Sequence, residues 1–288
     1  MSNILVTGGL GFIGSHLVER LLANKNNKIT VVDNLCSESS SRDNIRDGVD
    51  YIIEDVRNMD SLRLSEDFDL VFHLAALARI QPSFLNPVKY FSIDAFGTAQ
   101  VLEHARRCKA RVVYAGSSSA FGGPMLNPYA FAKYTGEQLC EMYNKVYGLS
   151  TVTARFFNVY GARQPVTGPY ATVVGVFENQ FLNGEPITVT GDGEQRRDFT
   201  HVSDIVLGLI SLAQKEWNAD MFQLGTGVNY SINQLANFFS DNIVYIPPRP
   251  GEAEITLADV GPVNKATNWS AEVTLQNYVS KWKKSINK

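Results

Sequence analysis

The chain has 288 residues, of which 44% are hydrophobic and 19% are charged, and its formal net charge at pH 7 is −3. These values are ordinary for a globular protein with one large core, and the slight negative charge gives no reason to expect a nucleic-acid partner. The three cysteines are scattered, and no signal peptide or membrane-spanning segment is visible. We therefore expect a cytoplasmic protein with no disulfide framework, no metal site and no membrane attachment.

In the first half of the chain, short apolar segments typical of buried strands alternate with segments of helical periodicity. Strands are expected at 4–6, 29–33, 51–53, 70–74, 112–115 and 151–156, and long helices at about 88–107 and 129–147. This alternation predicts βαβ units and a doubly wound parallel sheet.

The pattern changes after about Gly161, where loops lengthen and glycine and proline become frequent. A helix at about 205–213 and a strand at 221–224 are expected to return to the main body. The sequence therefore predicts two lobes in an α/β fold. Residues 1–165 with about 200–225 would form the main domain, and 166–199 with 226–288 a smaller C-terminal lobe.

A glycine-rich stretch, TGGLGFIG at residues 7–14, lies between the first expected strand and the first expected helix. In this setting Gly8, Gly11 and Gly14 are typical of a Rossmann-type dinucleotide site, where glycines let a pyrophosphate approach the N–H groups of a helix start. The spacing G-x-x-G-x-x-G differs from the commoner G-x-G-x-x-G. A glycine-rich turn without a ligand is the alternative.

Acidic residues follow the next two expected strands. Asp33 ends the second strand, where its carboxylate would accept hydrogen bonds from the adenosine ribose and repel the extra phosphate of NADP. NAD is therefore favoured over NADP. Asp55, followed by Val56, comes after the third strand and would contact the adenine, or else it is a solvated loop acid.

Three polar residues are candidates for chemistry. Tyr129 and Lys133 are four apart in an expected helix, so both side chains lie on one face. A cation about 4 Å away at an effective dielectric of about 20 is worth ~4 kcal/mol, about three pKa units, which would bring a phenol near physiological pH. Ser117 follows the fifth strand, at the sheet edge where ligands bind, although a run of serines is often only a turn.

These motifs continue along nearly the whole chain in a fixed order. Further stretches are HLAA at 73–76, SSSAFG at 117–122, RFFNVYG at 155–161, GDGEQRRDFTHV at 191–202 and PRPGE at 248–252. With them the sequence resembles the extended short-chain dehydrogenase/reductases of the NAD-dependent nucleotide-sugar epimerase/dehydratase type, in particular UDP-glucose and UDP-N-acetylglucosamine 4-epimerases.

The resemblance implies NAD as cofactor, a nucleotide-diphosphate sugar as substrate, and roles for individual residues. Tyr129 would be the acid or base on the sugar hydroxyl, Lys133 would bind the nicotinamide ribose, and Ser117 would hold the reacting hydroxyl. The expected cofactor contacts are Gly8, Gly11, Phe12, Ile13, Gly14, Asp33, Asn34, Asp55, Val56, Leu74, Ala75, Ala76, Tyr129, Lys133 and Phe156. The expected substrate contacts are Ser117, Ser119, Asn158, Thr172, Val173, Arg197, Arg249, Glu252 and Thr256.

The reaction type depends on the two residues after Ser117. Dehydratases of this family carry Asp-Glu there and decarboxylases usually keep the Glu, whereas this chain has Ser118 and Ser119. Serine cannot take a proton from carbon at neutral pH, so a 4-epimerase is expected. The alternatives are a reductase, dehydrogenase or dehydratase on the same substrates, or a non-catalytic dinucleotide-binding protein.

Other features concern specificity and assembly. Thr256 stands where 4-epimerases carry a bulky Tyr or a small residue, and a small one would admit an N-acetyl sugar. Asp94 stands where the family commonly has Asn. Only eleven residues separate Ser117 from Tyr129, about half as many as the family usually has. The resemblance also implies a homodimer in which the helices at about 88–107 and 129–147 form a four-helix bundle. Candidates for its seam, or else for the core, are Phe91, Leu102, Met142 and Tyr143.

Overall fold

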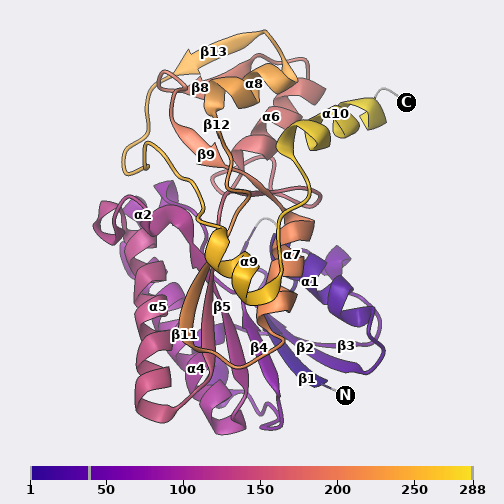
Figure 1. Cartoon of the computed structure of the whole chain (residues 1–288), viewed down its shortest axis with the longest axis vertical. Coiled ribbons are helices and arrows are strands. Elements are labelled where there is room, and N and C mark those ends of the chain that lie inside the picture. Colours follow the sequence, from indigo (N-terminus) through magenta and orange to yellow (C-terminus); the bar gives the residue numbers. More distant parts are fainter. Residues whose placement is uncertain (1, 38–39, 287–288) are drawn as a thin grey trace.

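Seven parallel strands form the central sheet in the computed structural model, which describes residues 2–37 and 40–286 (Figure 1). The strands are β1 Ser2–Thr7, β2 Asn27–Asp33, β3 Val49–Ile53, β4 Leu70–His73, β5 Arg111–Ser117, β6 Thr151–Phe156 and β11 Asn218–Leu224. Their order is β11-β6-β5-β4-β1-β2-β3, and every neighbouring pair is parallel. This is the doubly wound Rossmann order with β11 added beyond β6, which confirms the predicted fold class.

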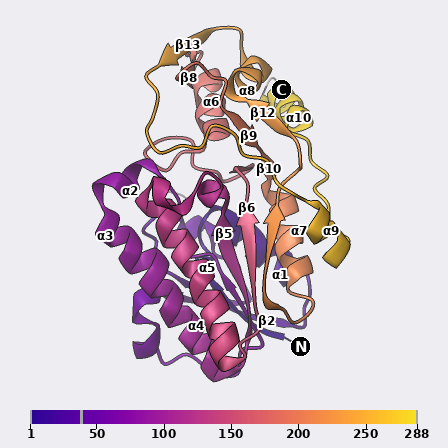
Figure 2. The same cartoon turned by 60° about the vertical axis from the view of Figure 1, so that its left-hand side comes forward.

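Helices cover both faces of the sheet. Figure 2 shows α4 (Gly97–Cys108) and α5 (Pro128–Tyr147) on one side, with α1 (Phe12–Leu22) and α7 (Val202–Leu212) on the other. Successive residues of β1 point to opposite faces, so Ile4 and Val6 join the core under α1 and α7, and Leu5 joins the core under α4 and α5. A strand buried on both faces is apolar throughout, which is why its short hydrophobic run predicted it correctly.

The helix expected at about 88–107 is not a single regular helix. It consists of α3 (Pro87–Tyr90), a π-helical turn (Phe91–Phe96) and α4. A π turn adds one residue per turn to an α-helix and often occurs at functional sites, but hydrophobic periodicity does not reveal it. Here the turn carries Asp94, which is buried.

The smaller lobe has a core of its own, built around Phe177, Phe199, Leu235 and Phe239. Its elements are α6 Val173–Leu182, β8 Ile187–Thr190, β9 Arg196–Asp198, β12 Asn229–Ser231, α8 Ile232–Phe239, β13 Ile243–Ile246 and α10 Leu275–Ile286. β8 pairs with β13 in parallel and β9 with β12 antiparallel, while β7 (Val159–Tyr160) pairs with β10 (Thr200–His201) in a separate two-stranded sheet.

One C-terminal segment crosses back to the large lobe. α9 (Gly261–Thr267) lies beside the large sheet in Figure 1, and Val263 and Trp269 belong to the core beneath α1 and α7. The division into 1–165 with 200–225 and 166–199 with 226–288 stays a prediction, but these residues of its second part pack on the first. The remaining short helices are η1 Arg42–Asn44, η2 Val56–Ser61, α2 Gln81–Leu85, η4 Ser118–Ala120 and η5 Pro124–Leu126.

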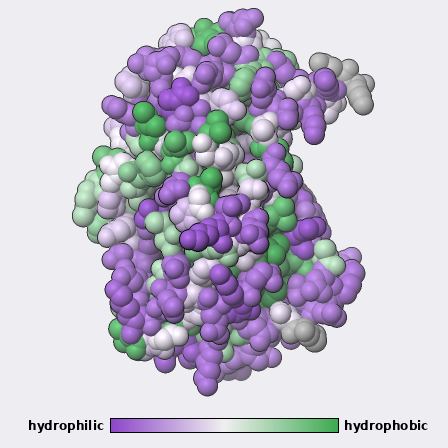
Figure 3. All heavy atoms as spheres, viewed as in Figure 1, coloured by the Kyte–Doolittle hydropathy of each residue, from purple (hydrophilic) through white to green (hydrophobic). Residues whose placement is uncertain are grey.

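The face shown in Figure 3 is largely hydrophilic on both lobes, and many of its hydrophobic residues lie around the level at which the lobes meet. Among the described residues no helix is both long and apolar enough to cross a membrane. The three cysteines are free, and the described residues hold no cluster of His, Cys, Asp and Glu that would bind a metal.

Candidate active site

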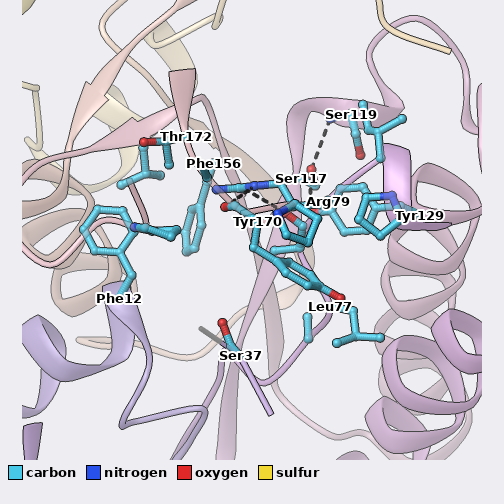
Figure 4. Close-up of a pocket in the computed structure, with 18 of the residues that line it drawn as sticks. Phe12, Ser37, Leu77, Arg79, Ser117, Ser119, Tyr129, Phe156, Tyr170 and Thr172 are labelled. Atoms are coloured by element: carbon cyan, nitrogen blue, oxygen red, sulfur yellow. Dashed lines mark hydrogen bonds between the residues drawn. The ribbon is translucent and has the colours of Figure 1, made fainter. Parts of the chain in front are cut away.

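A cleft of about 1230 Å³ opens between the two lobes, at the carboxyl ends of the parallel strands. This is the edge at which doubly wound sheets bind ligands. Ligand pockets usually measure about 300–1,000 Å³, so the cleft has room for a dinucleotide and a second ligand. Figure 4 shows side chains from both lobes facing into it.

The glycine-rich loop fits a dinucleotide. Gly8 has a φ of 73°, in the left-handed region, and a Cβ on Gly14 would lie 2.1 Å from the carbonyl oxygen of Gly8, so neither position tolerates a side chain. Gly11 precedes α1 and provides no side-chain cap, so the first N–H groups of α1 stay available to a phosphate. Gly8, Gly11, Phe12, Ile13 and Gly14 all line the cleft, as predicted.

Asp33 also lines the cleft and ties the glycine loop to β2. Its carboxylate accepts hydrogen bonds from the N–H groups of Leu10 at 3.0 Å and Leu35 at 2.8 Å. Burial raises the pKa of Asp33, and these donors oppose the rise. The contact of Asp33 with the ribose stays a prediction. Its hydrogen bonds also hold the glycine-rich loop in place.

The two residues predicted near the adenine differ in their surroundings. The Asp55 carboxylate forms a two-point ion pair with Arg57, at 2.9 Å and 2.8 Å, and also accepts a hydrogen bond from Asn34. This pairing lowers the pKa of Asp55. Val56 and Asn34 line the cleft, whereas Asp55 is not among its lining residues, and the adenine contact of Asp55 and Val56 stays a prediction.

The segment 74–76 lines the cleft directly after β4. Before it, His73 is fully buried between the hydroxyls of Thr7, at 2.7 Å from Nδ1, and Thr98, at 2.9 Å from Nε2. Burial lowers the pKa of His73 to about 3, so the ring is neutral and holds β1, β4 and α4 together.

The predicted tyrosine and serine meet at the cleft. The Tyr129 hydroxyl donates to Ser117 Oγ at 3.2 Å. Asn127 caps α5 by accepting the N–H of Ala130 at 2.7 Å, which places Tyr129 in the first turn of the helix. Ser117 ends β5, and its Oγ also accepts the N–H of Ser119. A phenol and a hydroxyl in this arrangement can pass a proton to or from a bound alcohol.

The charges around Tyr129 differ from the expected lysine effect. Burial raises the pKa of Tyr129 to about 12, with Ser117 and Arg79 lowering it and Asp94 raising it. Lys133 is buried one turn away, with its Nζ 4.3 Å from the centre of the Tyr114 ring. Burial lowers the pKa of Lys133, and Asp94 and Glu137 oppose that shift.

Asp94 is 1% exposed, and only one of its carboxylate oxygens is hydrogen-bonded within the described residues. Oδ1 accepts the N–H of Leu77 at 2.8 Å, while Oδ2 is buried without a partner. Burial raises the pKa of Asp94 to about 7, against the pull of Lys133. A raised acid pKa means that the folded chain holds the proton over a range in which the unfolded chain has lost it.

The free energy of unfolding should therefore fall as the pH rises through the range in which only the unfolded chain has lost the Asp94 proton. Between about pH 4 and 7 the Asp94 contribution destabilises the fold progressively, by up to about 4 kcal/mol. We expect Asp94→Asn to gain stability over the wild type in thermal unfolding as the pH rises, with a clearly larger advantage at pH 8 than at pH 5. Asp241→Asn, an exposed counterpart, should show no such divergence. Parallel pH curves for Asp94→Asn and the wild type would refute the assignment.

The small lobe supplies the other predicted contacts. Thr172 caps α6 by accepting the N–H of Gly175 at 3.0 Å, so the start of this helix, with Val173, faces the cleft. Asn158 has a φ of 28° and donates to the Asp198 carbonyl at 2.8 Å. Such a strained backbone often accompanies a functional position.

Two arginines from the small lobe face the same space. Arg197 is buried and donates to Glu252 at 3.4 Å, whereas Arg249 is exposed. Ser119, Thr256 and Phe156 also line the cleft, and the hydroxyl oxygens of Ser119 and Thr256 are buried without partners among the described residues. Apart from Asp55, the residues predicted for cofactor and substrate therefore surround one cleft.

The sequence prediction missed Arg79 and Tyr170. Figure 4 shows both in the middle of the pocket, between Phe156 and Tyr129. The Arg79 Nε donates to the Tyr170 carbonyl at 2.6 Å, which joins the segment after β4 to the loop before α6. Arg79 follows the 73–76 motif by only three residues. A basic residue so close to the end of β4 was the one feature of the sequence that could have predicted its place at the cleft.

Comparison with known proteins identifies the chain's family. A putative UDP-glucose 4-epimerase from Methanocaldococcus jannaschii is 32% identical over 310 residues, with 99% of each chain covered. UDP-glucuronic acid decarboxylase 6 from Arabidopsis thaliana is 30% identical, over 95% of this chain and 85% of the relative. The crystal structure of UDP-glucose 4-epimerase from Thermotoga maritima with UDP-glucose superposes with a TM-score of 0.90 at 29% identity, covering 99% of each chain. The model of the NAD dependent epimerase/dehydratase family matches residues 4–225, and the chain therefore belongs to that family.

Proposed function

We propose that this protein is a UDP-sugar 4-epimerase that uses NAD, the cofactor of its family, to oxidise the sugar at C4 and then reduce it from the other face. The observation that carries the proposal is the Tyr129–Ser117 hydrogen bond at the cleft, followed directly by Ser118 and Ser119. The 4-epimerases among its relatives support the same reaction.

The residues have distinct tasks in this proposal. The glycine loop and Lys133 would hold NAD, which would supply the hydride acceptor and donor for C4. Tyr129 accepts the proton of the C4 hydroxyl and gives it back, while Ser117 holds that hydroxyl in place. Lys133 binds the nicotinamide ribose. Ser118 and Ser119 carry no carboxylate, so these two positions offer no acid or base to move protons on C5 or C6.

The small lobe would hold the nucleotide. The start of α6 at Thr172 and Val173, together with Asn158, offers donors to the diphosphate. Arg197 and Arg249 add cations, because guanidinium forks match phosphate oxygens. Glu252 would accept from the nucleotide ribose once its 3.4 Å contact with Arg197 is exchanged for the ligand.

One incubation separates the proposal from its rivals. The purified protein is mixed with UDP-sugars without added reductant, and the products are followed by NMR and by NADH absorbance. Interconversion of C4 epimers without net NADH supports the epimerase. Accumulating NADH indicates a dehydrogenase, loss of water a dehydratase, a pentose a decarboxylase, and no reaction a binding protein. A panel of UDP, dTDP, GDP and CDP sugars then identifies the base.

We also propose that the small side chain of Thr256 leaves room for the N-acetyl group of sugars such as UDP-N-acetylglucosamine. Thr256 lines the cleft and is 5% exposed, so a larger side chain there would project into the ligand space. Thr256→Tyr is expected to lower kcat/KM for N-acetyl sugars by about 10–100-fold, with a smaller loss for UDP-glucose. Thr256→Ser is the matched control. Unchanged N-acetyl activity in the tyrosine variant would refute this role.

Assembly as a homodimer, and a cytoplasmic location, are further parts of the proposal. Phe91 and Met142 are 37% and 38% exposed, which supports their place in a seam formed by the α4 and α5 region. Leu102 and Tyr143 instead belong to the core beneath these helices, so of the two roles considered for them the core role applies. The free cysteines support a reducing compartment.

A further inference from the structure

Arg79 is a cation of the cleft with no acidic partner among the residues that the structure describes. Its Nε donates to the Tyr170 carbonyl at 2.6 Å and its Nη1 to the Ala78 carbonyl at 2.7 Å, so the guanidinium is held in place. Within residues 2–37 and 40–286, Nη2 makes no hydrogen bond, and no ion pair includes Arg79. Arg197 differs, because it pairs with Glu252.

The groups that surround Arg79 do not balance its charge. Three tyrosines, Tyr129, Tyr90 and Tyr170, act on it electrostatically. The pKa of Tyr129 is about 12, and burial raises that of Tyr90, so both phenols are neutral at pH 7. Burial lowers the pKa of Arg79, yet a guanidinium stays charged in proteins. Arg79 is only half-buried, and a guanidinium that is held in a cleft without a carboxylate beside it is free to pair with an anionic ligand.

The position of Arg79 indicates which anion this is. The proposed diphosphate contacts, Arg197 and Arg249, come from the small lobe, and the pyrophosphate of NAD belongs at the start of α1. Arg79 comes from the large lobe and lies between Phe156 and Tyr129 in Figure 4, on the side where the reacting sugar is proposed. An anion that lies beside Tyr129, at the proposed position of the reacting sugar, would be carried by the sugar itself.

We propose that Arg79 binds a carboxylate on the sugar, so that the preferred substrates are nucleotide-linked acidic sugars rather than neutral hexoses. This inference rests on the proposed function. A planar carboxylate suits the free edge of the guanidinium, with Nη2 donating. The carboxylate would be part of the ring substituent at C5, as in a hexuronic acid, or belong to an ether-linked lactate, as in muramic acid.

The test compares acidic and neutral sugars with the full-length protein. We would measure kcat/KM for C4 epimerisation of UDP-glucuronic acid, UDP-N-acetylmuramic acid, UDP-glucose and UDP-N-acetylglucosamine by NMR. The variants are Arg79→Gln, which removes the charge, and Arg79→Lys, which keeps the charge but loses the fork. Arg20→Gln, at an exposed position of α1, is the matched control.

The wild type is expected to prefer one of the two acidic sugars. A preference for UDP-glucuronic acid places the carboxylate at C5, and a preference for UDP-N-acetylmuramic acid places it on the lactate. Arg79→Gln should lower kcat/KM for that sugar by about 100-fold and for neutral sugars by less than about threefold, with Arg79→Lys between them. A wild-type preference for neutral sugars would overturn the inference. An equal loss on both classes would also overturn it, because Arg79 would then act on Tyr129 or on the Tyr170 loop.

Failure of the proposed function has a different signature. If no sugar is epimerised, calorimetric binding of UDP-glucuronic acid, UDP-N-acetylmuramic acid and UDP-glucose still tests Arg79. Tighter binding of an acidic sugar than of UDP-glucose that is lost in Arg79→Gln supports the inference, and equal binding refutes it. A UDP-pentose product would refute epimerisation while supporting an acidic substrate.

Discussion

Replacing Tyr129 by phenylalanine is expected to lower kcat for epimerisation by about 10²–10⁴-fold, the usual contribution of a positioned acid–base group. The ring would stay packed against Leu77, Tyr90 and Ile93, so the fold and the binding of NAD should persist. Only the hydroxyl that donates to Ser117 is lost. Steady-state kinetics, with NAD and UDP affinities measured alongside, would separate the loss of proton transfer from a loss of binding.

The pH dependence gives this prediction a second readout. The Tyr129 pKa of about 12 means that few molecules hold the phenolate at pH 7, so wild-type kcat should rise with pH across the neutral range. That rise should vanish in Tyr129→Phe. Tyr134→Phe, on the same helix but only partly buried, is the control. Activity of Tyr129→Phe within threefold of the wild type would assign the proton transfer to another group.

Gly14→Ala is expected to weaken NAD binding by about 100-fold and to destabilise the fold by ~1–3 kcal/mol. The added Cβ would lie 2.1 Å from the Gly8 carbonyl oxygen and 2.8 Å from the Gly9 Cα. Both are backbone atoms, so the loop itself must move away from the start of α1. The N–H groups that would hold the pyrophosphate then lose their alignment. Calorimetric titration with NAD and thermal unfolding measure the two effects.

Gly11→Ala is the matched control for folding. Its Cβ would lie 3.4 Å from the Gly8 oxygen and 3.5 Å from Ser40 Oγ, which are ordinary contacts. Its φ of −78° is open to any residue, so its thermal stability should match the wild type. Wild-type NAD affinity in Gly14→Ala would show that the pyrophosphate binds elsewhere.

The strands and the glycine loop were predictable because their signals are local. An apolar run buried on both faces, or a glycine where no side chain fits, is imposed by the immediate neighbours. The joint role of Tyr129 and Ser117 was implied by the family resemblance, and in the structure the end of β5 and the start of α5 bring the two hydroxyls together. The π turn at Asp94 escaped prediction, because it keeps the same apolar residues and changes only the hydrogen-bond register.

Other properties depend on distant partners. Asp55 has the position expected of an adenine contact, and its two-point ion pair with Arg57 could not be read from the sequence pattern. Leu102 was equally suited to a dimer seam or a core, and only the packing beneath α4 decides between them. Arg79 became notable only in the folded structure, where none of its ion pairs or hydrogen bonds within residues 2–37 and 40–286 involves a carboxylate.

The return of α9 to the large lobe bears on how this architecture can change. Because Val263 and Trp269 fill the core beneath α1 and α7, the part of the chain after residue 225 contributes to the core of the large sheet as well as to the small lobe. This part therefore cannot be replaced by that of a relative through a cut at residue 225 alone. The exchange would also remove Val263 and Trp269 from the core of the large lobe. New substrate preferences are therefore more accessible through single side chains at the cleft, such as Arg79 and Thr256, than through replacement of a whole lobe.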